Sequence, residues 1–140
     1  MTSKVFLDTN IFLDHLLARN SHSIGVVKLC ERRIISGFAS SASFYTLAYI
    51  IEDKLKKSAQ PILLDYCQFI ETISTTQENL NIALMSNFRD TEDAFQYYTA
   101  LNEKGLNYFV TSNPRDFKAA HSKLAVISPK EFMSIILQEL

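Results

Sequence analysis

The stretch Val5-Phe6-Leu7-Asp8-Thr9-Asn10 joins a short apolar run to three polar residues near the start of the chain. Residues 4–8 predict a short buried strand, because an apolar run without polar alternation is typical of a strand covered on both faces. Thr9 or Asn10 is suited to cap the helix that follows. In an open parallel sheet, ligands bind beyond the carboxyl ends of the strands. The stretch therefore predicts a functional sheet edge that carries Asp8.

Two further polar stretches follow the same logic. Arg89-Asp90-Thr91-Glu92-Asp93-Ala94 stands where a helix should begin, and Thr111-Ser112-Asn113-Pro114-Arg115-Asp116-Phe117 follows a predicted strand. If all strands are parallel, acids from the three stretches can share one pocket. Several carboxylates in one place repel strongly unless a divalent cation is bound between them. The three stretches together point to a metal-dependent enzyme.

Apolar spacing and breaker residues outline the other elements. Strands are predicted at about 4–8, 37–40, 107–111 and 124–127, with helices at about 11–17, 24–35, 43–55, 62–73, 77–86, 90–105 and 128–140, and an extended piece near 74–76. Strands and helices thus alternate along the chain, and the strands are short and apolar, without a polar residue at every second position. Both features favour a parallel sheet covered on both faces. We predict an α/β fold, a three-layer α/β/α sandwich with a short central parallel sheet, as a single domain over residues 1–140.

Composition bounds the possible functions. The 140 residues are 47% hydrophobic and 21% charged, with a net charge of −1, which argues against a broad basic face for nucleic acid but leaves room for a nuclease with an acidic site. Cys30 and Cys67 fit neither a zinc site nor a disulfide framework and are predicted to be buried, reduced thiols. The apolar run 44–51 is too short to span a bilayer. We expect a cytoplasmic protein with no membrane partner.

Other chemistries lack their motifs, and each acidic stretch has a simpler interpretation. The sequence contains no GxGxxG, no GxxxxGK and no GxSxG. Asp8 could simply be the cap of a helix. It could also belong to a phosphatase nucleophile loop, although such loops normally carry a second acid at the position where this chain has Asn10. Asp90 could be an ordinary helix cap, and residues 113–116 could be only a turn. The occurrence of all three stretches at one predicted sheet edge favours a shared site.

The stretches Leu7-Asp8-Thr9-Asn10-Ile11, Asp90-Thr91-Glu92-Asp93-Ala94 and Thr111-Ser112-Asn113-Pro114-Arg115-Asp116-Phe117 resemble the three signatures of the PIN domain. That family includes the VapC-type ribonuclease toxins of bacterial toxin–antitoxin pairs. The resemblance covers nearly the whole chain in length, motif order and spacing. It implies an endonuclease that uses Mg²⁺ (or Mn²⁺) to cleave single-stranded RNA, and it makes a small antitoxin protein a possible partner.

The resemblance also assigns roles to residues. It implies that Asp8, Asp93 and Asp116 hold the metal and, together with Asn113, carry the catalysis. The supporting residues would be Asn10, which orients the first acid, Asp90 and Thr111. Independently of the resemblance, Arg115, Lys118 and Lys123 lie close in sequence to the site and could contact the RNA backbone, although solvated surface charge is the commoner role of such residues.

The sequence departs from the family at one position. The family commonly carries an acid in the helix after the second strand, where this chain has Thr46 or Leu47, and Glu52 lies too far along that helix to replace it. A catalytically weak PIN-like module that binds RNA or protein is therefore the alternative function.

Apolar residues on the early helices exceed what one small core needs, which predicts that some of them form a homodimer surface or an antitoxin groove. These residues are Phe12, Leu16, Leu17, Phe44, Tyr45 and Tyr49.

Overall fold

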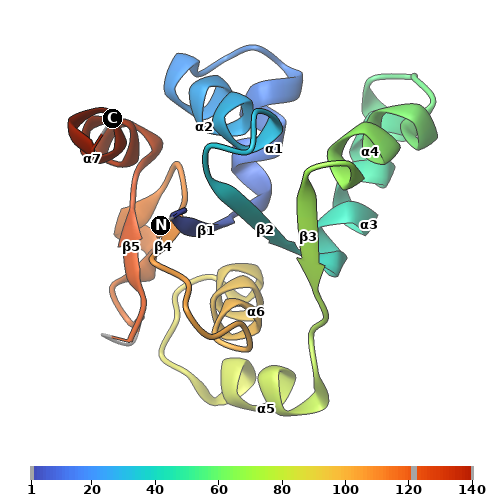
Figure 1. Cartoon of the computed structure of the whole chain (residues 1–140). Coiled ribbons are helices and arrows are strands. Elements are labelled where there is room, and N and C mark those ends of the chain that lie inside the picture. Colours follow the sequence, from blue (N-terminus) through green and yellow to red (C-terminus); the bar gives the residue numbers. More distant parts are fainter. Residues whose placement is uncertain (1, 121–122, 140) are drawn as a thin grey trace.

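A computed structural model describes residues 2–120 and 123–139 of the chain (Figure 1). Within these residues, one sheet of five strands has the order β3-β2-β1-β4-β5, and every neighbouring pair is parallel. The strands are β1 (Lys4–Leu7), β2 (Ser36–Ser40), β3 (Ile70–Ile73), β4 (Tyr108–Val110) and β5 (Ala125–Ile127). The predicted short central parallel sheet is confirmed.

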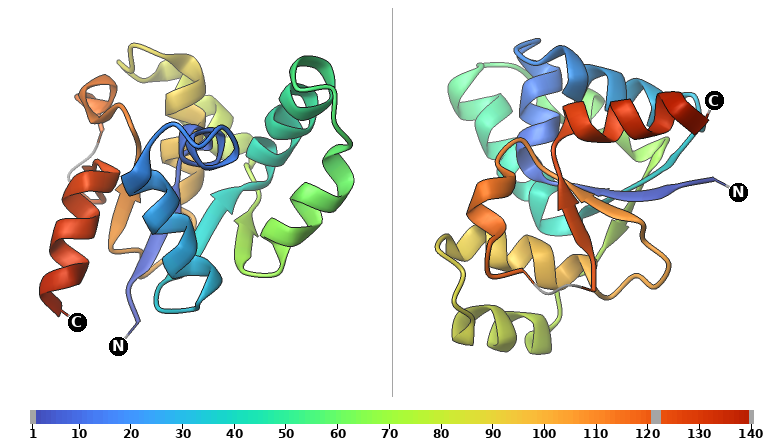
Figure 2. Two further views of the ribbon diagram at one scale, coloured as in Figure 1. Left: turned by 90° about the horizontal axis from the view of Figure 1, so that it is seen from above. Right: turned by 90° about the vertical axis from the view of Figure 1, so that its left-hand side faces the viewer.

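Helices cover both faces of this sheet (Figures 1 and 2). One face carries α1 (Thr9–Leu16), α2 (Ser21–Glu31) and α7 (Pro129–Glu139), and beside α1 pack α3 (Ser41–Tyr49), the π-helical turn η1 (Ile50–Lys54) and α4 (Ala59–Cys67). The other face carries α6 (Thr91–Ala100), with α5 (Gln77–Met85) packed against it and the 3-10 turn η2 (Pro114–Phe117) near β5. The molecule is thus the three-layer α/β/α sandwich that the sequence predicted.

The alternation of side chains along β1 builds two cores. Val5 and Leu7 point into the larger cluster under α1, α2 and α7, whereas Phe6 points into the cluster under α6. All three are fully buried. Phe6 stacks on Phe109 of β4 with ring centroids 5.0 Å apart. An apolar strand without polar alternation is what a sheet covered on both faces requires.

The connection after β1 creates a switch point in the sheet. The chain passes from β1 to β2 on one side, whereas β4 pairs with β1 on the other. The crevice beyond the carboxyl ends of such strands is where open α/β sheets bind ligands. Asp8 N–H bonds Val110 O (3.0 Å) and Thr111 N–H bonds Ile127 O (3.0 Å), so Asp8 and Thr111 both stand at that edge.

The sequence-based assignment was wrong around β3. A helix was expected over 62–73 with an extended piece at 74–76, but α4 ends at Cys67 and the strand is Ile70–Ile73. No glycine or proline separates the two elements, so the sequence carries no breaker there. The strand lies at the sheet edge, and its two central residues, Glu71 and Thr72, are exposed. Packing at this edge, rather than local preference, ends the helix.

The two cysteines differ in their surroundings. Cys30, a residue of α2, is buried next to Gly37 of β2. A Cβ added to Gly37 would lie only 2.6 Å from the Cys30 sulfur and 2.8 Å from Ile70 Cδ1. A Cβ at this position would therefore force the side chain of Cys30 or Ile70 to move, and glycine lets α2 pack closely against the sheet. Cys67 is exposed at the end of α4, so the expectation of two buried thiols holds for Cys30 alone. Among the described residues, no helix is long and apolar enough to cross a membrane.

Candidate metal centre

Asp8 is the buried anchor of the candidate site. It follows β1, is only 2% exposed, and precedes the first turn of α1 as its N-cap. Its Oδ1 accepts a hydrogen bond from Thr9 N–H (2.7 Å), and its Oδ2 accepts one from the Thr111 hydroxyl (2.8 Å). A carboxylate oxygen has two lone pairs, so each oxygen of Asp8 keeps one for a ligand. The two bonds fix the side chain without saturating it.

The first turn of α6 brings two more acids to Asp8. Asp90 caps this helix by accepting a hydrogen bond from Asp93 N–H (3.0 Å). One carboxylate oxygen from each of Asp8, Glu92 and Asp93 lies within 4.8 Å of the other two. Asp93 is half-buried and Glu92 is exposed. The structure therefore joins the carboxyl end of β1 to the start of α6 in one acidic group.

The acids of this group disfavour each other's ionisation. Burial, and then the charges of Glu92 and Asp90, raise the pKa of Asp8 to about 7, although hydrogen bonds from Thr111 and Thr9 lower it in part. Burial, followed by the charges of Asp8, Asp90 and Asp116, raises the pKa of Asp93 to about 7. Although Glu92 as a residue is exposed, desolvation of its carboxyl group and then the charges of Asp93 and Asp90 likewise raise the pKa of Glu92 to about 7. A cation among these oxygens would offset the cost of burying charged carboxylates and would neutralise their mutual repulsion.

The predicted residues of the third stretch lie beside this group. Asp116 is half-buried in η2, and its charge acts on Asp93, but its carboxylate is outside the group of three. Asn113 is exposed and donates its backbone N–H to Thr111 Oγ1 (3.2 Å). Arg115 is exposed on the same turn, and Lys118 is exposed just after it. A cavity of about 370 Å³ opens there, lined by residues 112–116.

The supporting residues form a compact hydrogen-bond network at the sheet edge. Asn10 donates from Nδ2 to Thr111 Oγ1 (3.2 Å), and its Oδ1 accepts from Ser112 N–H (3.2 Å). Thr111 Oγ1 thus accepts from Asn10 and from the Asn113 N–H, and gives its single proton to Asp8. This network determines which way the Asp8 carboxylate faces.

Glu92 is the member of the acidic group that the sequence analysis missed. Its carboxyl accepts a hydrogen bond from Gln96 one turn later, which lowers its pKa in part. Gln96 is buried and accepts from the Ser43 hydroxyl (3.2 Å), which in turn bonds the Thr9 hydroxyl (2.7 Å). The relay links α1, α3 and α6. The available sequence signal was the four-residue spacing of Glu92 and Gln96, at which two side chains of one helix meet, but the burial of Gln96 is seen only in the structure.

The position of the absent helix acid is clear in the structure. Thr46 is exposed, and its hydroxyl bonds the Ala42 carbonyl of the same helix (3.4 Å). Leu47 is fully buried in the core, and Glu52 is exposed on η1. None of these three belongs to the acidic group found among the described residues. Glu52 therefore does not replace the missing carboxylate.

The donor set suits a hard divalent cation. All three ligand atoms are carboxylate oxygens, which Mg²⁺ prefers, and Mg²⁺ keeps several waters, so two or three protein ligands suffice. With metal–oxygen bonds of about 2.1 Å, ligands on opposite sides of Mg²⁺ are about 4.2 Å apart. The 4.8 Å span of the group is close to that distance. The residues present fit such an ion.

Comparisons with known proteins agree with this architecture. A family model described as PIN domain matches residues 4–115. The structure of VapBC2 from Rickettsia felis, bound to a DNA fragment from its promoter, is similar with a TM-score of 0.67 and 16% identity, over 89% of this chain and 98% of that one. A toxin–antitoxin complex from Klebsiella pneumoniae gives 0.63 and 18%, over 89% and 97%. No curated protein matches the chain.

Proposed function

Because the chain belongs to the PIN domain family, we propose that it is a metal-dependent endonuclease that cleaves single-stranded RNA. The observation that carries this proposal is the convergence of Asp8, Glu92 and Asp93 at the carboxyl edge of the sheet. The resemblance to PIN nucleases implies an acidic active site. Among the described residues, Asp8, Glu92 and Asp93 form the one group of three acids close enough to share a metal ion. The raised pKa values of its members support a site built for a cation.

Asp8 and Asp93 would hold Mg²⁺ or Mn²⁺ directly, with Glu92 completing the set and Asp116 acting from beside it. A bound divalent cation supplies Lewis-acid chemistry to a phosphodiester and makes water a better nucleophile near neutral pH. Thr111 and the Thr9 N–H hold Asp8 for this task. Asp116, whose charge acts on Asp93, would orient a water molecule.

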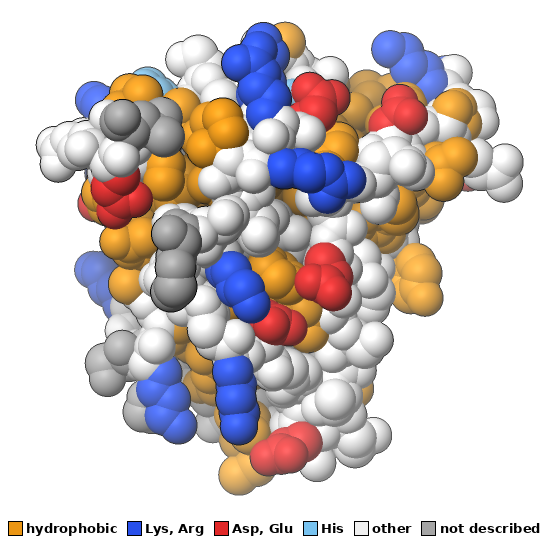
Figure 3. Space-filling view, in the orientation of Figure 1, with side chains coloured by type: hydrophobic (Ala, Val, Ile, Leu, Met, Phe, Trp, Pro, Cys, Tyr) orange, Lys and Arg blue, Asp and Glu red, His pale blue; other side chains and the backbone are white. Residues whose placement is uncertain are grey.

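RNA contacts would come from a few local cations. Arg115 and Lys118 are exposed and lie within two residues of Asp116, whose charge acts on Asp93, and we propose that they meet phosphates of the RNA backbone. The face in Figure 3 mixes basic and acidic side chains without a patch of one sign. The net charge of −1 agrees with contacts limited to the neighbourhood of the site. Asn113, exposed between them and Thr111, would share the catalytic edge.

We further propose that the chain is the toxin of a toxin–antitoxin pair, that it binds a small antitoxin protein, and that two copies of it form a homodimer. Of the similar solved structures, the one from Klebsiella pneumoniae is described as a toxin–antitoxin complex, and the one from Rickettsia felis is described as VapBC2. Tyr45 (78% exposed) and Tyr49 (63% exposed) stand one turn apart on α3, and Leu64 (62% exposed) lies on the neighbouring α4. Exposed apolar groups of this size favour a protein partner. Of the six apolar residues on the early helices, some of which were expected on this surface, Phe12 belongs to the core and is fully buried.

Cleavage of single-stranded RNA in Mn²⁺, with an EDTA control, tests the nuclease. Asp93→Asn should reduce the rate by at least about 100-fold, because metal stabilisation of the transition state is worth several kcal/mol and each 1.36 kcal/mol is tenfold. Glu52→Gln is the matched control, since Glu52 is exposed and outside the group. Equal cleavage by wild type and Asp93→Asn would assign the activity to other residues or to a contaminant.

One observation favours the second candidate, a catalytically weak module that binds RNA or protein. The helix position of the family acid holds exposed Thr46 or buried Leu47, so the site has one carboxylate fewer. Fluorescence anisotropy with a labelled single-stranded RNA separates the two candidates. Binding that is unaffected by Mn²⁺, together with no cleavage, supports the module. Cleavage that EDTA stops supports the enzyme.

A further inference from the structure

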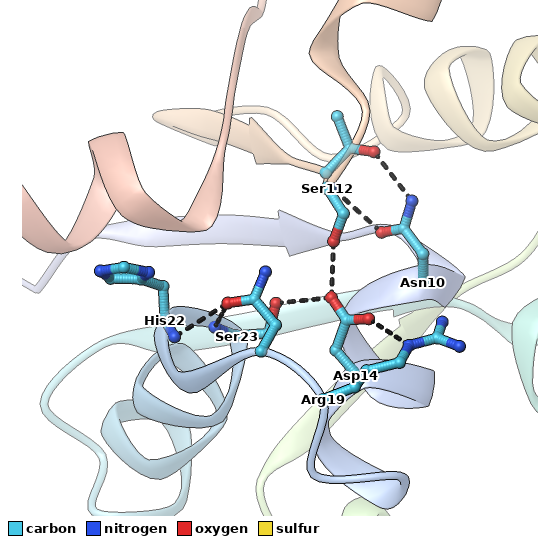
Figure 4. Close-up of polar contacts among 8 residues, drawn as sticks. Asn10, Asp14, Arg19, His22, Ser23 and Ser112 are labelled. Atoms are coloured by element: carbon cyan, nitrogen blue, oxygen red, sulfur yellow. Dashed lines mark hydrogen bonds and ion pairs between the residues drawn. The ribbon is translucent and has the colours of Figure 1, made fainter.

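Asp14 is a buried carboxylate that joins three segments of the chain (Figure 4). Its Oδ1 accepts from Arg19 Nε (2.7 Å), in the turn after α1. Its Oδ2 accepts from two hydroxyls, that of Ser23 at the start of α2 (2.8 Å) and that of Ser112 in the segment after β4 (2.6 Å). Burial raises the pKa of Asp14, but the bonds from Ser112, Arg19 and Ser23 outweigh it, so the pKa is lowered.

The Ser112 bond connects Asp14 to the acidic group. Ser112 lies directly after Thr111, and its N–H bonds Asn10 Oδ1 (3.2 Å). Asn10 in turn donates to Thr111 Oγ1 (3.2 Å), and the Thr111 hydroxyl reaches Asp8 Oδ2 (2.8 Å). A continuous path of hydrogen bonds thus runs from Asp14 to Asp8. Figure 4 shows its middle part, with Ser112 between Asp14 and Asn10.

We propose that Asp14 is a positioning residue for the metal centre, which holds the 111–113 segment through Ser112 and thereby fixes the direction of the Asp8 carboxylate. A joint between α1 and α2 alone would need only Arg19 and Ser23. The third bond is the shortest of the three and is directed at the segment that supports Asp8. Polar groups behind metal ligands typically change metal affinity or activity by about 10–100-fold when removed. The catalytic part of this inference rests on the proposed function.

Two serines provide a matched pair of variants. Ser23 and Ser112 each donate one hydroxyl to the same oxygen of Asp14, so Ser23→Ala and Ser112→Ala each leave Asp14 with two of its three donors. Only Ser112 leads to the acidic group. A merely structural role for Asp14 makes the two variants equivalent, whereas a positioning role separates them.

Mn²⁺ titration and steady-state cleavage give the first readout. Ser112→Ala should bind Mn²⁺ about tenfold more weakly and lose about tenfold in kcat, with KM for RNA within about twofold of wild type. Ser23→Ala should stay within about twofold of wild type in all three quantities. Equal losses in both variants, or no loss in Ser112→Ala, would overturn the positioning role.

Amide hydrogen exchange gives a readout that needs neither metal nor RNA. The N–H groups of residues 112 and 113 bond Asn10 Oδ1 and Thr111 Oγ1, so both should exchange at least about tenfold faster in Ser112→Ala and Asp14→Asn but not in Ser23→Ala. If wild type neither binds Mn²⁺ nor cleaves RNA, the proposed function fails, and this pattern alone decides whether Asp14 orders the segment. Unchanged exchange in Ser112→Ala would refute the inference in either case.

Discussion

The hydroxyl of Thr111 gives its only proton to Oδ2 of Asp8 across 2.8 Å, although the two residues are 103 positions apart in the chain. Thr111→Val keeps the shape of the side chain but removes this bond and the acceptor for Asn10 and the Asn113 N–H. We expect a loss of about 1–3 kcal/mol in the free energy of unfolding, because buried partners are left unsatisfied, together with about tenfold weaker Mn²⁺ binding.

Chemical denaturation and Mn²⁺ titration measure these two effects. Thr46→Val is the control, since the hydroxyl of Thr46 is exposed and bonds only within its own helix at 3.4 Å. If both variants lose stability equally, the Thr111–Asp8 bond contributes nothing specific.

Divalent cations should stabilise the folded chain. A ligand that binds only the folded state at 100 times its Kd adds about 2.7 kcal/mol, which corresponds to a rise of roughly 5–10 °C in Tm for a domain of this size. Asp8→Asn should remove most of that rise, because Asp8 is the buried member of the acidic group. Thermal melts with Mn²⁺ and with EDTA provide the measurement. A rise of the same size in Asp8→Asn would place the bound ion elsewhere.

Stability without divalent cations should fall as the pH increases toward 7. Burial raises the pKa of Asp8 and Asp93 from 3.8 to about 7. Between those values the folded state holds more protons than the unfolded state, so the free energy of unfolding decreases with rising pH. Burial lowers the pKa of His15, which acts in the opposite direction over part of this range. Asp93→Asn should therefore show a shallower decrease than wild type.

Melting curves in EDTA from about pH 5 to about pH 8 measure this difference, because they span the raised pKa values. His15, Asp8 and Glu92 are common to both proteins, so subtracting one curve from the other isolates the contribution of Asp93. Parallel curves for wild type and Asp93→Asn would show that folding does not raise the pKa of Asp93.

Glu92 should contribute to metal affinity as the third member of the acidic group. Glu92→Gln keeps the size of the side chain and should weaken Mn²⁺ binding by about tenfold. Glu78→Gln is the control, since Glu78 is an exposed glutamate in the first turn of another helix, α5. Isothermal titration compares both with Asp116→Asn. A larger loss in Asp116→Asn than in Glu92→Gln would favour the ligand set inferred from the sequence.

The sequence predicted the sheet and its functional edge because parallel strands leave a strong local pattern. Asp8 follows an apolar run, and Asp93 sits in the first turn of a helix, so topology alone suggested that they meet. The structure brings these two acids together. Their role as ligands stays a prediction.

The sequence did not single out Glu92 or locate β3, for two physical reasons. Glu92 and Asp93 are neighbours at a helix start, where the helical period does not decide which one faces the sheet edge, and the relay through Gln96 is a tertiary contact. The strand Ile70–Ile73 follows α4 without a glycine or proline, and half of it is exposed. Only its pairing with β2 reveals it as a strand.

Because Cys30 is buried and Cys67 is exposed, the two thiols should react with an alkylating reagent at different rates. Burial raises the pKa of the Cys30 thiol to about 12, and its sulfur fills the space that Gly37 leaves open. An alkylating reagent should therefore modify exposed Cys67 at a rate set by the reagent, but modify Cys30 only while α2 is lifted from the sheet. The ratio of the two labelling rates would report how often this side of the molecule opens, in the native sequence and without an engineered cysteine.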